Sequence, residues 1–109
     1  MAIESLSDEQ KDIVLRCLRA TAAYVDDWEK PARLGLEPED LQALIAAWPN
    51  VDESTEAGLL GISNCLNEVA NGFRIAPGDW PKWFNVPLSE VRKTYGVWLV
   101  LKGTRREIA

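Results

Sequence analysis

The chain has 109 residues, of which 47% are hydrophobic and 27% are charged, and it contains no histidine. This balance predicts one globular domain that buries a core without metal or disulfide staples, and the lack of histidine excludes histidine-based acid–base and nucleophilic catalysis. The formal net charge of −5 disfavours generic binding to phosphate backbones.

The charge is distributed unevenly along the chain. Residues 1–56 carry thirteen acids and five bases, and residues 57–109 carry four acids and seven bases, so the two parts have net charges of −8 and +3. Such asymmetry is suited to docking onto a partner of opposite charge, although most charged faces are only solvated. The bases after residue 90 leave room for a local anion-binding surface.

The two cysteines, Cys17 and Cys65, fall on the apolar sides of predicted helices, which favours buried, reduced thiols, and a disulfide or a redox pair is the alternative. Two cysteines without histidine cannot supply the four ligands of structural zinc. No apolar run approaches the ~20 residues of a membrane helix, and the first residues lack the pattern of a signal peptide. We therefore expect a cytoplasmic protein with no membrane association and no cofactor.

The first predicted helix begins at Ser7 and is ended by Pro31. Ser7 and Gln10 have the spacing of a capping box, and a proline cannot continue a helix. Apolar side chains recur along this segment at helical spacing, which predicts a buried stripe. The stripe consists of Ile13, Val14, Cys17, Leu18, Thr21, Tyr24, Val25 and Trp28.

Charged residues are predicted on the outer side of the same helix. Asp12 with Arg16 and Asp26 with Lys30 are spaced as ion pairs one turn apart. The acidic cluster at residues 26–29 comes close to the end of the helix, where the dipole disfavours acids. A solvated corner is the favoured interpretation of this cluster, and an acidic interaction patch is the alternative.

Two further helices follow, separated by a short turn. One runs from about Pro38 to Trp48, with proline in its first turn and a second proline after its end. The next begins near residue 52 or 54 and ends at Asn71, with glycine as its stop. Gly58 and Gly61 inside this helix each cost about 1 kcal/mol relative to alanine, which predicts a closely packed neighbouring helix.

Residues 73–87 are rich in aromatic residues and prolines and predict an ordered connector. A last helix is predicted over 88–102, and the β-favouring run 97–101, paired with residues 73–75, is the alternative as a short strand. The predicted fold is therefore all-α: a compact four-helix single domain over residues 1–109, with an aromatic, proline-rich connector before the last helix. The ends, residues 1–6 and 103–109, are expected to be flexible.

Two surfaces are candidates for partner binding. The first is the connector residues Trp80, Trp83 and Phe84, because tryptophans dominate many interface hot spots. A plug that closes the end of the core is the favoured alternative for these aromatics. The second surface is a polar face of the third helix, for which a hydrated face without a function is the favoured interpretation. It carries Ser63, Asn64, Asn67, Glu68 and Asn71, and Leu60 falls among them; the candidates for partner binding on this face are Leu60, Asn64, Asn67 and Asn71.

Three pairs of carboxylates stand three residues apart, a spacing that can hold Mg²⁺ on a helix. Each pair also lies where a predicted helix begins, and the helix dipole favours acids there, so capping is the favoured interpretation. The pairs are Glu9 with Asp12, Glu37 with Asp40, and Glu53 with Glu56.

No catalytic, cofactor-binding or metal-binding residue is identified from the sequence. The favoured function is a small non-catalytic module, regulatory or adaptor in kind, that binds a protein partner or itself. Nucleic acid is disfavoured as a partner because the predicted helix ending at Asn71 carries no lysine or arginine with which to read DNA. The alternative is a carboxylate-based, Mg²⁺-dependent enzyme that acts on a phosphorylated small molecule.

Overall fold

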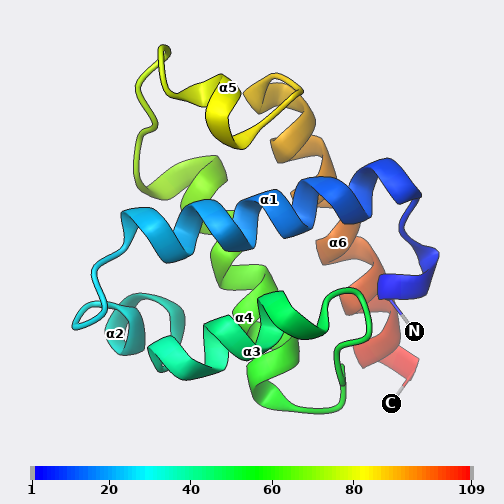
Figure 1. Cartoon of the computed structure of the whole chain (residues 1–109). Coiled ribbons are helices and arrows are strands. Elements are labelled where there is room, and N and C mark those ends of the chain that lie inside the picture. The colour runs from blue at the N-terminus through cyan, green and yellow to red at the C-terminus, as the bar shows by residue number, and fades with distance from the viewer. Residues whose placement is uncertain (1, 109) are drawn as a thin grey trace.

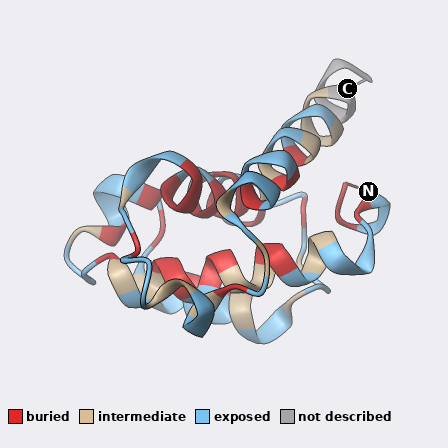
Figure 2. Ribbon diagram, turned by 90° about the horizontal axis from the view of Figure 1, so that it is seen from above, coloured by how far each residue is buried: buried red, intermediate tan, exposed pale blue. Residues whose placement is uncertain are grey.

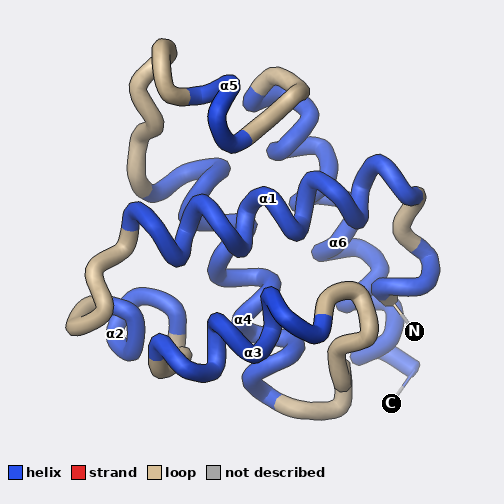
Figure 3. Tube along the Cα trace, viewed as in Figure 1, coloured by secondary structure: helices blue, strands red, loops and turns tan. Residues whose placement is uncertain are grey.

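The chain forms helices joined by short turns, with no strand among residues 2–108 (Figure 1 and Figure 3). The structure is a computed structural model that describes residues 2–108, and the side chains of all of these except residues 56, 57 and 104–108. The predicted all-α class is confirmed. In chain order the elements are the 3-10 turn η1 (Ile3–Ser5), α1 (Asp8–Tyr24), α2 (Lys30–Leu34), α3 (Pro38–Ala47), α4 (Glu56–Asn67), the π-helical turn η2 (Glu68–Gly72), α5 (Trp80–Trp83) and α6 (Leu88–Ile108).

The four predicted helices correspond to α1, α3, α4 and α6, and α4 lies at the centre of their packing. It contacts α1, α2, α3 and α6, and buried residues gather on the faces that the helices turn toward one another (Figure 2). The radius of gyration is 13.1 Å, close to the ~13 Å of a folded domain of about 100 residues. The helices therefore share one core.

The first helix begins as predicted but ends earlier. Ser7 and Gln10 form the capping box, with bonds of 2.9 and 3.1 Å, and Arg16 pairs with Asp12 at 2.7 Å. Helix α1 stops at Tyr24, and Pro31 does not end it but lies in the first turn of the separate helix α2. A proline is tolerated there because the first turn of a helix lacks an intrahelical partner for its N–H.

The turn between α1 and α2 overturns the prediction that Trp28 lies in the core, because its side chain is 78% exposed. Lys30 is buried instead, and its Nζ donates to the carbonyl oxygen of Val25 at 2.7 Å and to Asp27 at 2.6 Å. Lys30 therefore pairs with Asp27 and not with the predicted Asp26. Its side chain satisfies the carbonyl of Val25, just beyond the end of α1.

The prediction of close packing at the glycines of α4 is confirmed for Gly61. A Cβ atom added there would lie 2.8 Å from Leu36 Cδ1 and 2.9 Å from Leu44 Cδ1. At Gly58 the close neighbour is the backbone oxygen of Asp52, in the turn before α4, and not another helix. The predicted helix start near residues 52–54 falls in this turn, and Thr55 caps α4 by accepting a bond from Gly58 N.

The last turn of the predicted third helix widens into η2. Glu68, at its start, is buried, and its carboxylate accepts bonds from Arg33 of α2 at 2.8 and 3.0 Å. Gly72 packs directly against the carboxylate of Glu68, so a Cβ atom at this position would collide with it. Turns with π-helical geometry occur frequently at functional sites.

Residues 97–101 lie within α6, so the strand alternative for this segment is wrong. The helix is fixed from inside the core by Trp98, which is fully buried and donates from Nε1 to Ser63 Oγ at 2.9 Å. None of the helices formed by the described residues combines the length and the apolar character needed to span a bilayer.

The N-terminal segment of the chain makes defined contacts with the core. Ala2, Ile3 and Leu6 are buried, and Glu53, itself 1% exposed, accepts bonds from the N–H groups of Ala2 and Ile3 at 3.0 and 3.2 Å. At the other end α6 continues past residue 103 to Ile108. Residues 1 and 109 lie outside the described part of the chain, and the flexibility expected of the two ends stays a prediction.

Candidate functional site

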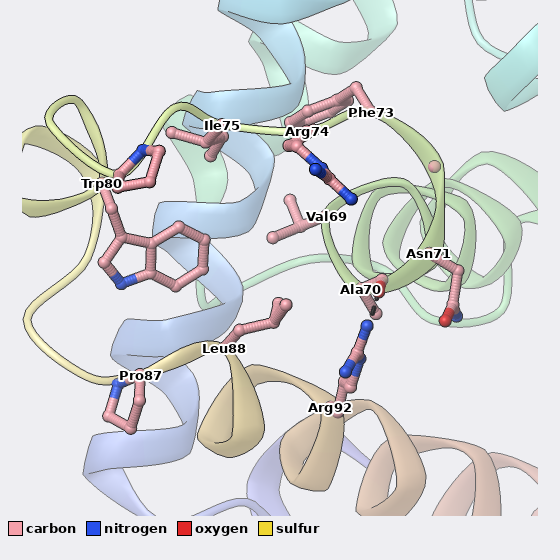
Figure 4. Close-up of a pocket in the computed structure, with 12 residues that line it drawn as sticks. Val69, Ala70, Asn71, Phe73, Arg74, Ile75, Trp80, Pro87, Leu88 and Arg92 are labelled. Carbon is pink, nitrogen blue, oxygen red and sulfur yellow. Dashed lines mark hydrogen bonds between the residues drawn. The ribbon is translucent and has the colours of Figure 1, made fainter.

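An open pocket of about 460 Å³ lies where η2, the segment that follows it and the start of α6 meet (Figure 4). Its volume falls in the range of about 300–1,000 Å³ that ligand pockets span. None of the residues that line it is acidic. They are Val69, Ala70, Asn71, Gly72, Phe73, Arg74, Ile75, Pro77, Trp80, Pro87, Leu88 and Arg92.

Trp80 forms an aromatic wall of this pocket. Its Nε1 donates to the carbonyl oxygen of Val86 at 2.8 Å, and its ring stacks on Phe84 with centroids 4.4 Å apart and an interplanar angle of 20°. Phe84 is only 2% exposed, whereas Trp80 is half-buried. Phe84 thus belongs to the core, as the plug interpretation predicts, and it holds Trp80 with part of its indole at the surface.

Two arginines approach the pocket from different elements. Arg92 of α6 donates from Nε to the carbonyl oxygen of Ala70 at 3.2 Å, which holds its guanidinium group against η2. Arg74 follows η2, is exposed, and forms no ion pair with any residue that the structure describes. Figure 4 shows the two guanidinium groups pointing toward one another, with Trp80 on another side of the pocket.

The residues that line this pocket carry a net positive charge, because they include two arginines and no acidic residue. Guanidinium groups are permanently protonated, and their planar forks match carboxylate and phosphate oxygens. The carboxylate of Glu68 in η2 is occupied by Arg33, and the nearby base Lys82 is engaged by Asp79 at 2.9 Å. That hydrogen bond to Asp79 raises the pKa of Lys82. The pocket therefore combines an apolar wall with two positive charges and suits an anionic group beside an apolar one.

The predicted connector residues do not act as one surface. Trp80 lines the pocket and Phe84 is buried, whereas Trp83 is half-buried and meets Tyr24 edge to face, with centroids 5.9 Å apart. Arg16 of α1 donates to the carbonyl oxygen of Trp83 at 3.1 Å, so this part of α5 is docked on α1. Of the three predicted residues, only Trp80 faces the pocket.

The predicted polar face of the third helix is also divided. Asn64 is half-buried and donates to the carbonyl oxygen of Leu34 at 2.7 Å. Asn67 and Asn71 are exposed and bonded to each other at 3.1 Å, and Leu60 is 40% exposed. Only Asn71 lines the pocket. Partner binding by these residues stays a prediction.

Sequence reasoning did not single out Arg74 and Arg92 as site residues. Arg92 was visible only as one of several bases in the positively charged part of the chain, and Arg74 only as a base near the aromatic connector. Arg74 and Arg92 line the same pocket because η2 turns the chain back toward α6. The spacing of residues along the sequence does not predict this turn. The signal that could have found them is the combination of basic residues with half-buried aromatics on either side of a glycine turn.

The carboxylate pairs are engaged in other ways. Glu37 and Asp40 form a reciprocal capping box at the start of α3, as the capping interpretation predicts. Asp12 pairs with Arg16, and Glu53 is buried against the N-terminal segment. Among the described residues, no group of three or more cysteine, aspartate or glutamate side chains is arranged to hold a metal ion.

The fold and the pocket together define a small all-α domain with an open aromatic and basic pocket. No family model, curated protein or solved structure matches this chain.

Proposed function

We propose that this domain is a non-catalytic protein-binding module, regulatory or adaptor in kind, that works in the cytoplasm. The observation that carries the proposal is the pocket that Trp80 lines together with Arg74 and Arg92. Aromatic residues and arginine are the residue types most enriched where protein interfaces concentrate their binding energy. The pocket would hold a partner segment by burying an apolar side chain against Trp80 and pairing a carboxylate with the arginines.

A protein partner fits these charges better than a nucleic acid does. The chain has a net charge of −5, and residues 1–56 alone carry −8. Nucleic-acid affinity grows with the number of phosphates that lysine and arginine neutralise, and an acidic surface repels the remainder. Two arginines in one pocket are enough for one carboxylate but not for a run of phosphates. The proposed ligand is therefore a short polypeptide segment with an acidic residue next to an apolar one.

Selection from a displayed library of random peptides tests this proposal. We expect the enriched peptides to carry Asp or Glu beside an aromatic or aliphatic residue, and to bind an Arg74→Glu variant at least about tenfold more weakly, because one charge-assisted contact becomes repulsive. Arg74 is exposed, so the substitution leaves the core intact. Arg19→Glu is the matched control, because Arg19 is an exposed residue of α1 that lies outside this pocket.

Two results would contradict the proposal. One is that no peptide is enriched, and the other is that the enriched peptides bind the Arg74→Glu and Arg19→Glu variants with equal affinity.

A further inference from the structure

The turn between α1 and α2 presents the most exposed large hydrophobic side chain among the described residues. Trp28 is 78% exposed, compared with 68% for Val100, the next in order. A single exposed aliphatic residue is ordinary, but tryptophan has a large apolar area and is rarely left this open. Trp28 is therefore a candidate for burial against a partner surface.

The turn that carries Trp28 is held in one conformation. Lys30 is 3% exposed, and its Nζ donates to the carbonyl oxygen of Val25 and to Asp27 at 2.7 and 2.6 Å. The N–H of Lys30 also bonds to the carbonyl oxygens of Asp26 and Asp27. Because the backbone is fixed in this way, docking Trp28 would order little more than its own side chain, and the entropic cost of binding is small.

The charges around Trp28 are opposite to those of the pocket. Asp26 is exposed, Asp27 has a side chain that is 77% exposed even though it pairs with Lys30, and Glu29 pairs with Arg33 at 3.5 Å. We call residues 26–29 the acidic turn. It offers an indole flanked by carboxylates, whereas the pocket offers an indole wall flanked by two guanidinium groups.

We infer that the acidic turn of one copy of this chain docks into the Trp80 pocket of a second copy, with Trp28 against the apolar wall and the neighbouring carboxylates on Arg74 and Arg92. The inference rests on the proposed function of the pocket and names the partner as this same chain. Complementary charge steers such an encounter and fixes its register, while the buried indole supplies most of the affinity.

The acidic turn and the pocket are linked within one chain by the contact between α2 and η2. Arg33 of α2, the helix that follows the acidic turn, is bonded to Glu68, the first residue of the η2 turn that lines the pocket. The start of α2 and η2 accordingly lie toward the same end of α1 in Figure 1. In a two-fold dimer the contact between turn and pocket forms twice, because each copy gives its acidic turn to its partner and receives the acidic turn of its partner. One turn docked into one pocket buries little surface for a stable interface. Two such contacts double the buried surface area, which brings the interface nearer to the size that stable complexes need.

Sedimentation velocity on the full chain tests this inference. From micromolar to millimolar chain concentration, we expect the wild type to shift from monomer to dimer, with a dimer that weakens as salt is added. Trp28→Ala removes the docked indole and Arg74→Glu reverses one pocket charge, and each should weaken dimerisation at least about tenfold. Both side chains are exposed, and circular dichroism should show unchanged helicity. Arg19→Glu is the matched charge control and should dimerise like the wild type.

A mixture of the two variants gives the sharpest result. In the mixed dimer, the unaltered acidic turn of the Arg74→Glu chain can dock into the unaltered pocket of the Trp28→Ala chain. A dimer of either variant alone has no contact in which both the turn and the pocket are unaltered. We expect the mixture to dimerise more tightly than either variant alone and more weakly than the wild type. A wild type that stays monomeric at every concentration overturns the inference. So does a dimer that neither variant weakens, or a mixture that behaves as the average of its components.

The failure of this inference can be told apart from the failure of the proposed function. A monomeric chain that still binds selected peptides through Arg74 would reject the second copy as partner and leave the pocket as a protein-binding site. A dimer insensitive to Arg74→Glu, together with no selected peptide, would reject both.

Discussion

Trp98 and Trp28 mark the extremes of burial among the tryptophans of this domain. Trp98 is fully buried and its indole N–H reaches the hydroxyl of Ser63, which also accepts from Lys102 and donates to the carbonyl oxygen of Leu59. A buried indole needs such a partner because an unsatisfied N–H in the core costs about 1–3 kcal/mol. Trp28 has its large apolar side chain in water instead, and this difference is what makes it a candidate for binding.

The buried thiols lead to a prediction at the same scale. Burial, the main cause, raises the pKa of Cys65 from 9.0 to about 12 and raises the pKa of Cys17 as well. Because the thiolate is the reactive form, neither cysteine should react with a thiol reagent at pH 8 in the folded protein, and both should react in urea. Time-resolved labelling with and without urea measures this. Equal rates in the two conditions would contradict it.

The same pKa shifts give the sign of a pH effect on stability. Between pH 9 and 12 the unfolded chain loses thiol protons that the folded chain retains, so the free energy of unfolding should fall as pH rises. The ideal slope is about 1.4 kcal/mol per pH unit for each thiol. A Cys65→Ala variant should show a smaller slope in urea titrations than the wild type.

Among the elements, α4 and α6 each contain two glycines, and Gly61 of α4 and Gly96 of α6 have opposite surroundings. A Cβ atom at Gly61 would meet Leu36 and Leu44 at 2.8 and 2.9 Å, whereas one at Gly96 would meet nothing within 4 Å. We expect Gly61→Ala to lower the free energy of unfolding by about 1–3 kcal/mol through overpacking. Gly96→Ala should raise it by about 0.5–1 kcal/mol through helix propensity.

Urea unfolding of the two glycine variants beside the wild type measures this difference, and Gly96→Ala serves as the matched control for propensity. If Gly61→Ala stabilised the protein as much as Gly96→Ala does, the close approach of α3 and its preceding loop to α4 would be wrong.

The elements also show where sequence patterns were ambiguous. The capping box at Ser7 and the first-turn proline of α3 predicted helix starts correctly, because these signals act within a few residues. Pro31 was predicted to end a helix but starts one, and a proline is compatible with either role. In the structure α1 already ends at Tyr24, and Lys30, at the start of α2, is buried with its Nζ bonded to the carbonyl oxygen of Val25.

For the whole molecule, the ion pair between Arg33 and Glu68 joins α2 to η2. Glu68 has a side chain that is 10% exposed and Arg33 one that is 35% exposed, so the pair is only partly screened by water. We expect Arg33→Ala or Glu68→Gln to lower the free energy of unfolding by about 1–3 kcal/mol, because the first leaves the buried carboxylate of Glu68 without its cation and the second removes the negative charge from the pair.

Asp12→Asn is the control for this prediction, because Asp12 and Arg16 form a more exposed pair within α1. Such pairs contribute about 0–1 kcal/mol. Urea unfolding of the three variants gives the comparison, and equal losses in all three would show that the α2–η2 contact has no special part in the fold.

Only some residues of the candidate site were predicted from the sequence. Trp80 and Asn71 were proposed on separate surfaces, and the structure places both in the lining of one pocket with Arg74 and Arg92. The polar face predicted for the third helix did not survive as a unit, because α2 and α6 cover Glu68 and Ser63. A helical pattern tells which side chains share a face, but not which neighbouring segment will cover that face.

The sequence by itself determined the helical class, the four main helices, several caps and the buried, reduced cysteines, because periodicity, capping and proline geometry act over a few residues. Only the tertiary structure decided that Trp28 is exposed, that Lys30 and Glu53 are buried, and that Arg74, Arg92 and Trp80 line one pocket. Those outcomes depend on contacts between segments far apart in the chain, where the surrounding side chains set the cost of burying a charge or exposing an indole.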